Sequence, residues 1–495
     1  YMPDTAQMFI EINRDCWDYY SSQQKDFINS HLDKHLVSIN RIDPLKFIEN
    51  LQSEFSPIHD KNAQFTYSLD NAHKLSLLHN PFTQEQISNI EFVFEGDNNN
   101  KITLDYYIKN EEDNNNNNID NNDSKEWKYS TKLKNGFKCL VDNDKNVNVF
   151  ILESLNFLGE ENHLDVTEVI LNCTKEFYNN SFPIIGIISN NEDGDIKLAL
   201  YLEQLLQIKL VQRTYFAAKK SDLMKNEINK NIDERKDIIN PETGKEYNNF
   251  DEMGEIIDDF GNNITLNRTK VFQIFNKTIL KEYKKIREEL YKLNNLKRPT
   301  DIIIFTDGIS SGATSFLIKD LQERGGAIIV GYKGNPKSNQ MFDSSQSASY
   351  FTSFKGSDEH KNLLECGFSI NEISIYQSFG DSYQEENPIP RKYKIFPVDE
   401  RVNIYHNYND SYYNEFIDKA IEIPCLQAEI MRRGGYSAIT FPQKNNKKAA
   451  VIGGGPSGLG AVYELITAGW QVDLYEKSAH LGGAAWLIDR KSVVE

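Results

Sequence analysis

The chain has 495 residues, of which 39% are hydrophobic and 12% aromatic, enough for the cores of roughly two to four domains. The net charge is −18 and no basic stripe is present, which argues against a nucleic-acid partner because phosphate binding requires clustered Lys and Arg. The longest apolar runs fall short of the ~18 residues that a membrane helix needs. We therefore expect no membrane span.

The cysteines bear on metal binding and disulfides, and the glycosylation sequons bear on the cellular compartment. Five scattered cysteines form neither a CxxC pair nor a Cys/His cluster, so we expect no metal site and no disulfide framework. Asn-x-Ser/Thr sequons favour the secretory route for residues 1–422. They occur at Asn122, Asn172, Asn179, Asn263, Asn267, Asn276 and Asn409.

Residues 1–146 are predicted to form a helical and β-hairpin region. Short helices are expected before residue 60, with a start signal at Asp43-Pro44. Residues 63–69 and 90–108 alternate as strands do, and the second segment turns at Gly96 as a hairpin. An Asn-rich insertion at 109–126 cannot bury apolar area, so we expect it to be disordered.

Residues 147–422 are predicted to form an α/β core. Apolar strands are expected at 149–152, 183–188, 301–305 and 327–331, and helices at 164–178, 195–209, 268–296 and 313–324. Residues 221–265 are polar and charged and are interpreted as a surface excursion. Apolar strands that alternate with helices indicate a mixed or parallel sheet covered on both faces.

The turn between the strand at 301–305 and the helix at 313–324 is rich in small residues. It runs from Thr306 to Ser315 and includes Ser310 and Ser311. A side chain in such a turn stands beside free helix N-terminal amides, which can stabilise an oxyanion. Helix-capping serines also occur in plain strand–helix turns, so the turn alone does not assign a function.

Taken with its neighbours, this turn resembles the tail-specific (C-terminal-processing) serine peptidase family over roughly residues 30–420. The resemblance is carried by Thr306-Asp307-Gly308, by the strand at Arg324 to Gly331, by Pro183 to Leu206, and by two closing segments at 389–391 and 397–399. It implies a peptidase-like mixed sheet, a polypeptide substrate or ligand and no cofactor for this domain.

The same resemblance implies a Ser–Lys dyad, in which a desolvated lysine activates the serine. Lys337 matches the family's lysine, but the residue 25 positions before it is Gly312, so the adjacent Ser311 is the candidate nucleophile. Gly194 is the candidate oxyanion donor, although Asp193 stands where the family has a second glycine. Two readings stay open: an active serine endopeptidase, or an inactive member that binds peptide or protein.

After a linker at 423–447, residues 448–495 carry a dinucleotide-binding pattern. A strand leads into Gly453-x-Gly455-x-x-Gly458, a helix follows, and a second strand ends at Glu476. Gly453 makes a tight turn, Gly455 lets the backbone approach a pyrophosphate, and Gly458 allows close helix packing. Glu476 is placed to bind ribose hydroxyls.

This segment resembles FAD-dependent oxidoreductases of the glutamate-synthase-small-subunit and disulfide-reductase kind over roughly residues 424–488. The resemblance implies FAD and favours the cytoplasm for residues 448–495. Because most strands of a flavin domain are missing, we expect a truncated βαβ unit that does not retain FAD. The alternative function is therefore a flavin oxidoreductase fragment fused to a peptidase-like domain, and a chimeric gene is one interpretation.

Overall fold

The computed structural model describes most of the chain in two compact units, Tyr1–Ala420 and Ile421–Glu495. Within the described ranges, no helix combines the length and apolarity needed to cross a membrane. The residues described are 22–31, 34–55, 58, 60–71, 90–96, 102–104, 127–131, 136–155, 160–191, 194–208, 214–235, 238–259, 265–274, 285–293, 295–346, 350–353, 372–379, 389–404, 413–433 and 444–477.

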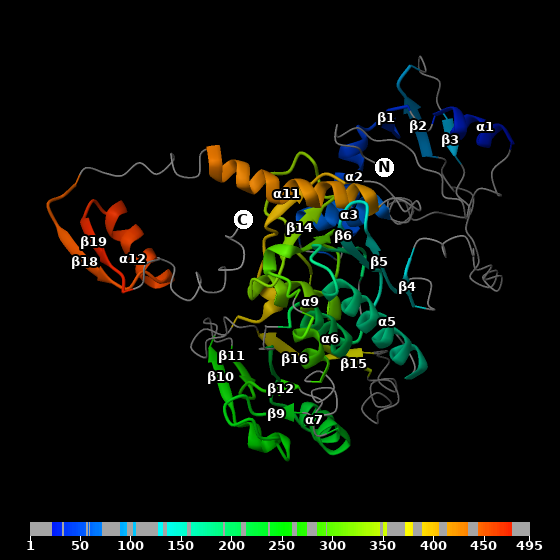
Figure 1. The fold of residues 1–495 in the computed structure, drawn as a ribbon. Helices are drawn as coiled ribbons and strands as arrows, with labels where there is room; N and C mark the ends of the chain where they lie inside the picture. Colours follow the sequence, from blue (N-terminus) through cyan, green and yellow to red (C-terminus); the bar gives the residue numbers. More distant parts are fainter. Residues whose placement is uncertain are drawn as a thin grey trace. The chain divides into compact units, whose positions relative to one another are not determined.

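A seven-stranded mixed sheet forms the centre of the first unit (Figure 1). Its strand order is β17-β14-β13-β7-β6-β5-β4, and neighbours from β17 to β6 are parallel whereas β5 and β4 are antiparallel. The strands are β4 (Tyr129–Ser130), β5 (Phe137–Asp142), β6 (Val147–Leu152), β7 (Ile184–Ile188), β13 (Ile302–Thr306), β14 (Ile328–Tyr332) and β17 (Glu400–Val402). The predicted α/β class is confirmed.

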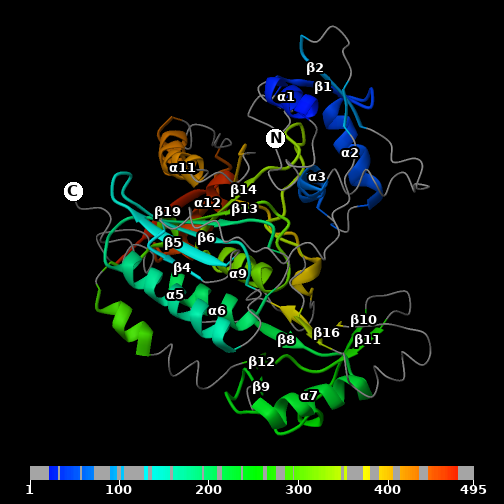
Figure 2. The same ribbon diagram turned by 90° about the vertical axis from the view of Figure 1, so that its right-hand side faces the viewer.

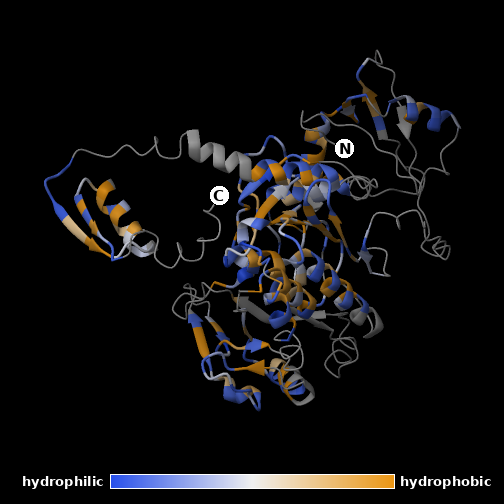
Figure 3. Cartoon of the chain, in the orientation of Figure 1, coloured by the Kyte–Doolittle hydropathy of each residue, from blue (hydrophilic) through white to orange (hydrophobic). Residues whose placement is uncertain are grey.

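Continuous apolar runs explain the burial of the central strands. Every residue of β6, β7 and β13 is buried, as expected for strands covered on both faces, and Figure 3 shows hydrophobic residues along them. The expected adjacency of 184–188, 302–305 and 327–330 is confirmed, because β13 pairs with both β7 and β14.

Helices cover both faces of the sheet (Figure 2). On one face α5 (Glu160–Tyr178), α6 (Ile196–Leu206) and α9 (Gly312–Glu323) pack side by side, as successive right-handed crossovers require. On the other face the first turns of α11 (Tyr413–Arg433) pack, where the Phe416 ring lies 5.1 Å from that of Phe305 and 4.9 Å from that of Tyr332.

The N-terminal region has a small core of its own, built from α1 (Ser22–His31), β1 (Leu36–Ile39), α2 (Pro44–Phe55), α3 (Lys61–Asp70), β2 (Ile90–Phe94) and β3 (Ile102–Leu104). The predicted helix after Asp43 and the predicted hairpin are confirmed. The predicted strand at 63–69 is wrong, because Asp60 caps a helix there by accepting the Ala63 N–H at 2.8 Å. Residues 105–126, with the Asn-rich insertion, lie outside the described residues.

An inserted lobe occupies the segment interpreted as a surface excursion. It contains a buried ion pair, with Arg268 Nε 2.5 Å and Nη2 3.0 Å from the Asp258 carboxylate. The helix predicted at 268–296 is wrong over its first residues, which form strands, and a helical segment is present only at 285–291 of the described residues. The lobe comprises β8 (Tyr215–Ala217), α7 (Asp222–Arg235), β9 (Ile238–Ile239), η4 (Phe250–Met253), β10 (Ile256–Asp259), β11 (Thr265–Arg268) and β12 (Gln273–Ile274), with β15 (Tyr350–Ser353) and β16 (Glu372–Phe379) pairing beside β8.

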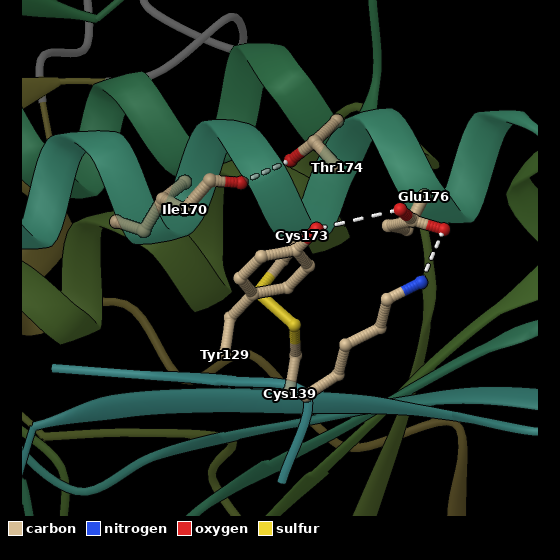
Figure 4. Close-up of a disulfide and its surroundings, with 7 residues drawn as sticks. Tyr129, Cys139, Ile170, Cys173, Thr174 and Glu176 are labelled. Carbon is tan, nitrogen blue, oxygen red and sulfur yellow. Dashed lines mark hydrogen bonds and ion pairs between the residues drawn. A yellow bond between two sulfur atoms is a disulfide. The ribbon is translucent and has the colours of Figure 1, made fainter.

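A disulfide joins Cys139 of β5 to Cys173 of α5, although the scattered cysteines, odd in number, did not suggest a disulfide framework. Both residues are fully buried between the helix and the sheet (Figure 4). Glu176, one helical turn further on, bonds to Tyr129 and Lys128 of the sheet edge. Spacing missed the bridge because 34 residues separate cysteines that only the sheet and its covering helix bring together.

The second unit is a βαβ element, as predicted. It contains β18 (Lys448–Ile452), α12 (Pro456–Thr467) and β19 (Gln471–Tyr475), and the two strands pair in parallel. Its apolar residues remain open to solvent, since Ile452 is 88% and Tyr475 59% exposed. Helix α12 packs against both strands, but two strands and one helix are too few to bury these two side chains.

Candidate functional site

The turn that follows β13 stands at the carboxyl edge of the parallel strands, where α/β folds commonly bind ligands. Two glycines set its path. Gly308 has φ +76° and no room for a side chain, because a Cβ there would lie 2.7 Å from the Phe342 ring. Gly312, which begins α9, has φ +54°. Ser311 lies between them, partly exposed, at the N-cap of α9.

Asp307 ties this turn to the turn that follows β7. Its carboxylate accepts the Asn190 N–H at 2.7 Å and the Ile309 N–H at 3.0 Å. The carbonyl of Asn191 in turn accepts the Ser311 N–H at 2.9 Å. Burial raises the pKa of Asp307 to about 6, although Lys333 opposes the shift. Two turns more than a hundred residues apart in the chain thus form one structure.

Within the described residues, four buried side chains beside this turn have polar atoms with no hydrogen-bond partner. Both side-chain polar atoms of Asn191 lack one, as do the hydroxyls of Ser310, Thr314 and Ser344. All four residues are at most 1% exposed. Leaving a buried polar atom unbonded costs about 1–3 kcal/mol, so such atoms are rare in native structures and each needs an explanation, such as a bound water or a ligand. We call these four residues the polar cluster.

Neighbouring hydroxyls are, in contrast, bonded. Ser315 Oγ donates to the Gln346 carbonyl at 2.8 Å and lies 2.9 Å from Ser345 Oγ. Thr306 Oγ1 donates to the Ser344 carbonyl at 2.9 Å. Bonded and unbonded hydroxyls thus lie side by side around the β13–α9 turn, and further unbonded buried atoms occur elsewhere in the described chain, for example in Arg391.

Lys337, the predicted base, lies in the loop after β14. Its side chain is exposed, and its backbone N–H donates to Asn335 Oδ1 at 3.0 Å. Among the described residues, no hydrogen bond or ion pair is found for its Nζ. The buried lysine of this loop is Lys333, whose Nζ donates to the Asp70 carboxylate at 2.9 and 3.2 Å.

Gly194, the predicted oxyanion donor, lies before α6 with φ +146° and forms a parallel bridge with Leu155. A Cβ here would lie 2.3 Å from Leu155 Cβ, which explains the glycine by packing alone. Its neighbour Asp193 lies outside the described residues. The roles assigned to Ser311, Lys337 and Gly194 therefore stay predictions.

Helix α3 covers the loop after β14, a relation that the sequence did not indicate. Asn62 Nδ2 donates to the Gln340 and Met341 carbonyls at 3.3 and 3.2 Å, and Thr66 Oγ1 accepts the Gly334 N–H at 2.9 Å. Ile309, in the turn before Ser311, packs against Ile58 and Ala63. The N-terminal region thus forms one side of the candidate site.

Acidic groups in this loop and at the start of α3 have shifted pKa values. Burial raises the pKa of Asp343 to about 6, with Lys319 opposing the shift through its amine 3.7 Å away. Burial also raises the pKa of Asp60, whose carboxylate accepts the Ala63 N–H. No group of three or more metal-binding side chains is found in the described part of the chain.

The glycine turn of the second unit has the geometry of a pyrophosphate cradle. Gly453 has φ +99°, and a Cβ at Gly458 would lie 1.8 Å from the Gly453 carbonyl oxygen. Open space surrounds Gly455, which begins α12 as its N-cap. The carboxylate of Glu476 accepts the Gly454 N–H at 2.5 Å. These residues fit the pyrophosphate and ribose of a dinucleotide.

A family model for NAD(P)-binding Rossmann-like domains matches residues 451–493. Among curated proteins, none matches this chain. The solved structures similar to it include mature CPAF complexed with lactacystin (TM-score 0.43, 11% identity, 87% of this chain and 82% of that chain). They also include mature CPAF by itself (TM-score 0.42, 9% identity, 88% and 82%). The α/β assignment follows from the strand order of this chain itself.

Proposed function

We propose that the first unit is a peptidase-like α/β domain that binds polypeptide at the carboxyl edge of its sheet and does not hydrolyse it by a Ser–Lys dyad. The observation that carries the proposal is the environment of Lys337. A lysine acts as a base only after it loses its proton, which requires burial beside its serine. The Lys337 side chain is exposed, and Gly312 stands 25 positions before it.

The polar cluster is closed to solvent in this structure, so a ligand reaches it only when the β13–α9 and β7–α6 turns part. Its chemistry then supports a polypeptide as that ligand. Asn191 offers one amide donor and one carbonyl acceptor, and the hydroxyls of Ser310, Thr314 and Ser344 can act as either. A neutral set of mixed donors and acceptors matches peptide groups, which present an N–H and a C=O together. It does not match an anion, which needs donors only, or a metal ion, which needs several carboxylates or imidazoles.

Peptide hydrolysis and peptide binding by the full chain test this proposal separately. With an unstructured polypeptide, we expect binding but no cleavage above the uncatalysed background. Cleavage that Ser311→Ala and Lys337→Ala both abolish would establish the active dyad and refute the proposal. Binding that persists unchanged in Asn191→Leu would exclude the polar cluster as the site.

For the second unit we propose that the glycine turn binds the pyrophosphate of a dinucleotide. The support is the cradle of Gly453 and Gly458, together with the open space at Gly455. When bound, such a group would supply redox chemistry, while this chain would hold its pyrophosphate at the α12 N-terminus. The described residues around the glycine turn form two strands and one helix, and we expect the purified chain to show no stoichiometric flavin absorption.

Calorimetric titration of the full chain with NAD and with FAD tests the glycine turn. Gly455→Ala should keep the fold, because its Cβ meets no atom within 4 Å, yet it should weaken binding at least tenfold by blocking the approach of the pyrophosphate. Gly460→Ala, also with open space around its Cβ, is the matched control and should bind as the parent does. Equal affinities for all three proteins would reject the site.

A further inference from the structure

Three of the sequons have both the asparagine and the hydroxyl residue within the described part of the chain, and they differ in surroundings. Asn179 lies in the turn that ends α5, followed by Asn180 and Ser181. Asn179 and Ser181 are exposed. The backbone N–H of Asn179 closes the helix on the Lys175 and Glu176 carbonyls at 3.1 Å, and no hydrogen bond involves its side chain among the described residues.

The other two sequons are packed into regular structure. The hydroxyl of Thr174, which completes the Asn172 sequon, is buried and donates to the Ile170 carbonyl at 2.8 Å. Thr269, which completes the Asn267 sequon, is buried and accepts the Ala218 N–H at 3.1 Å. Asn267 itself is in strand β11 and donates to Glu255. Of these three, only the Asn179 sequon is carried by an exposed turn.

The disulfide gives independent information about the compartment. Cys139 and Cys173 are bonded inside the core, and Cys173 lies on α5, the helix that ends at the Asn179 turn. Structural disulfides persist in oxidising compartments and are rare in the reducing cytosol. The secretory route supplies both disulfide formation and N-glycosylation.

We propose that the chain folds in the secretory pathway and carries an N-linked glycan on Asn179. In the transfer, Asn179 Nδ2 forms a bond to the anomeric carbon of an oligosaccharide carried on a lipid pyrophosphate. The bond between that carbon and the pyrophosphate oxygen breaks, the lipid pyrophosphate leaves, and the amide nitrogen loses one proton. The transfer is catalysed by the cell's oligosaccharyltransferase and needs no oxidant or reductant.

Mass spectrometry of the full-length protein, isolated from the cells that produce it with thiols alkylated at lysis, tests both parts. We expect a Cys139–Cys173 cross-linked peptide and a glycan on the Asn179 peptide that peptide N-glycosidase removes, leaving Asp at position 179. Asn179→Gln and Ser181→Ala should each abolish that glycan. Ser181→Thr should retain it, because threonine also completes a sequon.

Matched controls separate this site from the other sequons. Asn172→Gln and Asn267→Gln should leave the glycan on the Asn179 peptide unchanged. An unmodified Asn179 peptide in protein that carries the disulfide would refute the site. If Cys139 and Cys173 are found alkylated and unbridged, the proposal that the chain folds in the secretory pathway is wrong.

Discussion

The two strand–turn–helix segments, β13–α9 and β18–α12, are alike in local architecture but are stabilised differently. Each begins its helix at the carboxyl end of a parallel strand after a glycine with positive φ. In β18–α12 the decisive contact, between Gly453 and Gly458, is local. In β13–α9, Asp307 bonds to a residue 117 positions away and Ile309 packs on the N-terminal region. A sequence motif is enough to predict a turn whose contacts are local. It predicts only part of a turn whose contacts come from distant segments.

The largest expected difference is in local stability. Amide exchange in β7 and β13 should need global unfolding, at roughly 5–15 kcal/mol, because these strands are buried on both faces. Amides of β18, α12 and β19 should exchange with opening free energies near zero, since Ile452 and Tyr475 are exposed. Hydrogen-exchange mass spectrometry of the full chain measures both. Equal protection of β18 and β13 would contradict the contrast.

The disulfide should matter to the first unit alone. Replacing Cys139 and Cys173 with Ala should lower its free energy of unfolding by about 2–5 kcal/mol, because the bridge closes a loop across 34 residues. Each single variant should lose nearly as much as the double variant, since either one removes the bridge. Urea denaturation measures the loss. Exchange in β18 and β19 should not change, and a loss there would show that the units are coupled.

The buried Asp307 should give the first unit a distinctive pH dependence. Its pKa is about 6 in the folded chain against an ordinary value of 3.8, so the folded state favours the protonated form. Stability should therefore be fully present below pH ~4 and fall as the pH rises towards ~6, by about 3 kcal/mol from this group. Asp343, with a pKa of about 6, should contribute in the same direction.

Asp307→Asn cannot ionise and tests this assignment. Urea unfolding between pH 4 and 7 should show a fall about half as steep as in the parent, because Asp343 still titrates. Parallel profiles for parent and variant would show that Asp307 does not titrate in this window.

The smallest expected effect is the change in stability when a buried asparagine is replaced by leucine, and its sign distinguishes a ligand-binding asparagine from a structural one. Asn191→Leu removes two unbonded buried atoms and should raise stability by about 1–3 kcal/mol while weakening peptide binding. Asn148→Leu is the matched control, since Asn148 Nδ2 donates to Asn180 Oδ1 and the Phe182 carbonyl at 2.9 Å. It should lower stability by a similar amount. Thermal and urea unfolding measure both, and a destabilised Asn191→Leu would indicate a structural role.

The predictions from sequence succeeded where structure depends on neighbouring residues. The strands at 183–188 and 301–305 were recognisable from apolar runs, and Gly453 to Gly458 from a pattern whose geometry is local. The helix at α3 was mistaken for a strand, since Phe65, Tyr67 and Leu69 alternate while the Asp60 cap and the contacts with the 333–343 loop favour a helix. The strand β12 at 273–274 was missed because its partner, β9 at 238–239, lies more than thirty residues earlier in the chain.

By itself, the sequence determined the α/β class, the adjacency of the strands at 184–188, 302–305 and 327–330, and the glycine turn of the second unit, because apolar runs and glycines act over a few residues. Tertiary structure alone decided that Cys139 bonds Cys173, that Lys333 is buried while Lys337 is exposed, and that Asn191 adjoins Ser311. Burial and pairing depend on which distant segments meet. The residues that flank a lysine or an asparagine in the sequence do not reveal which distant residue it will contact.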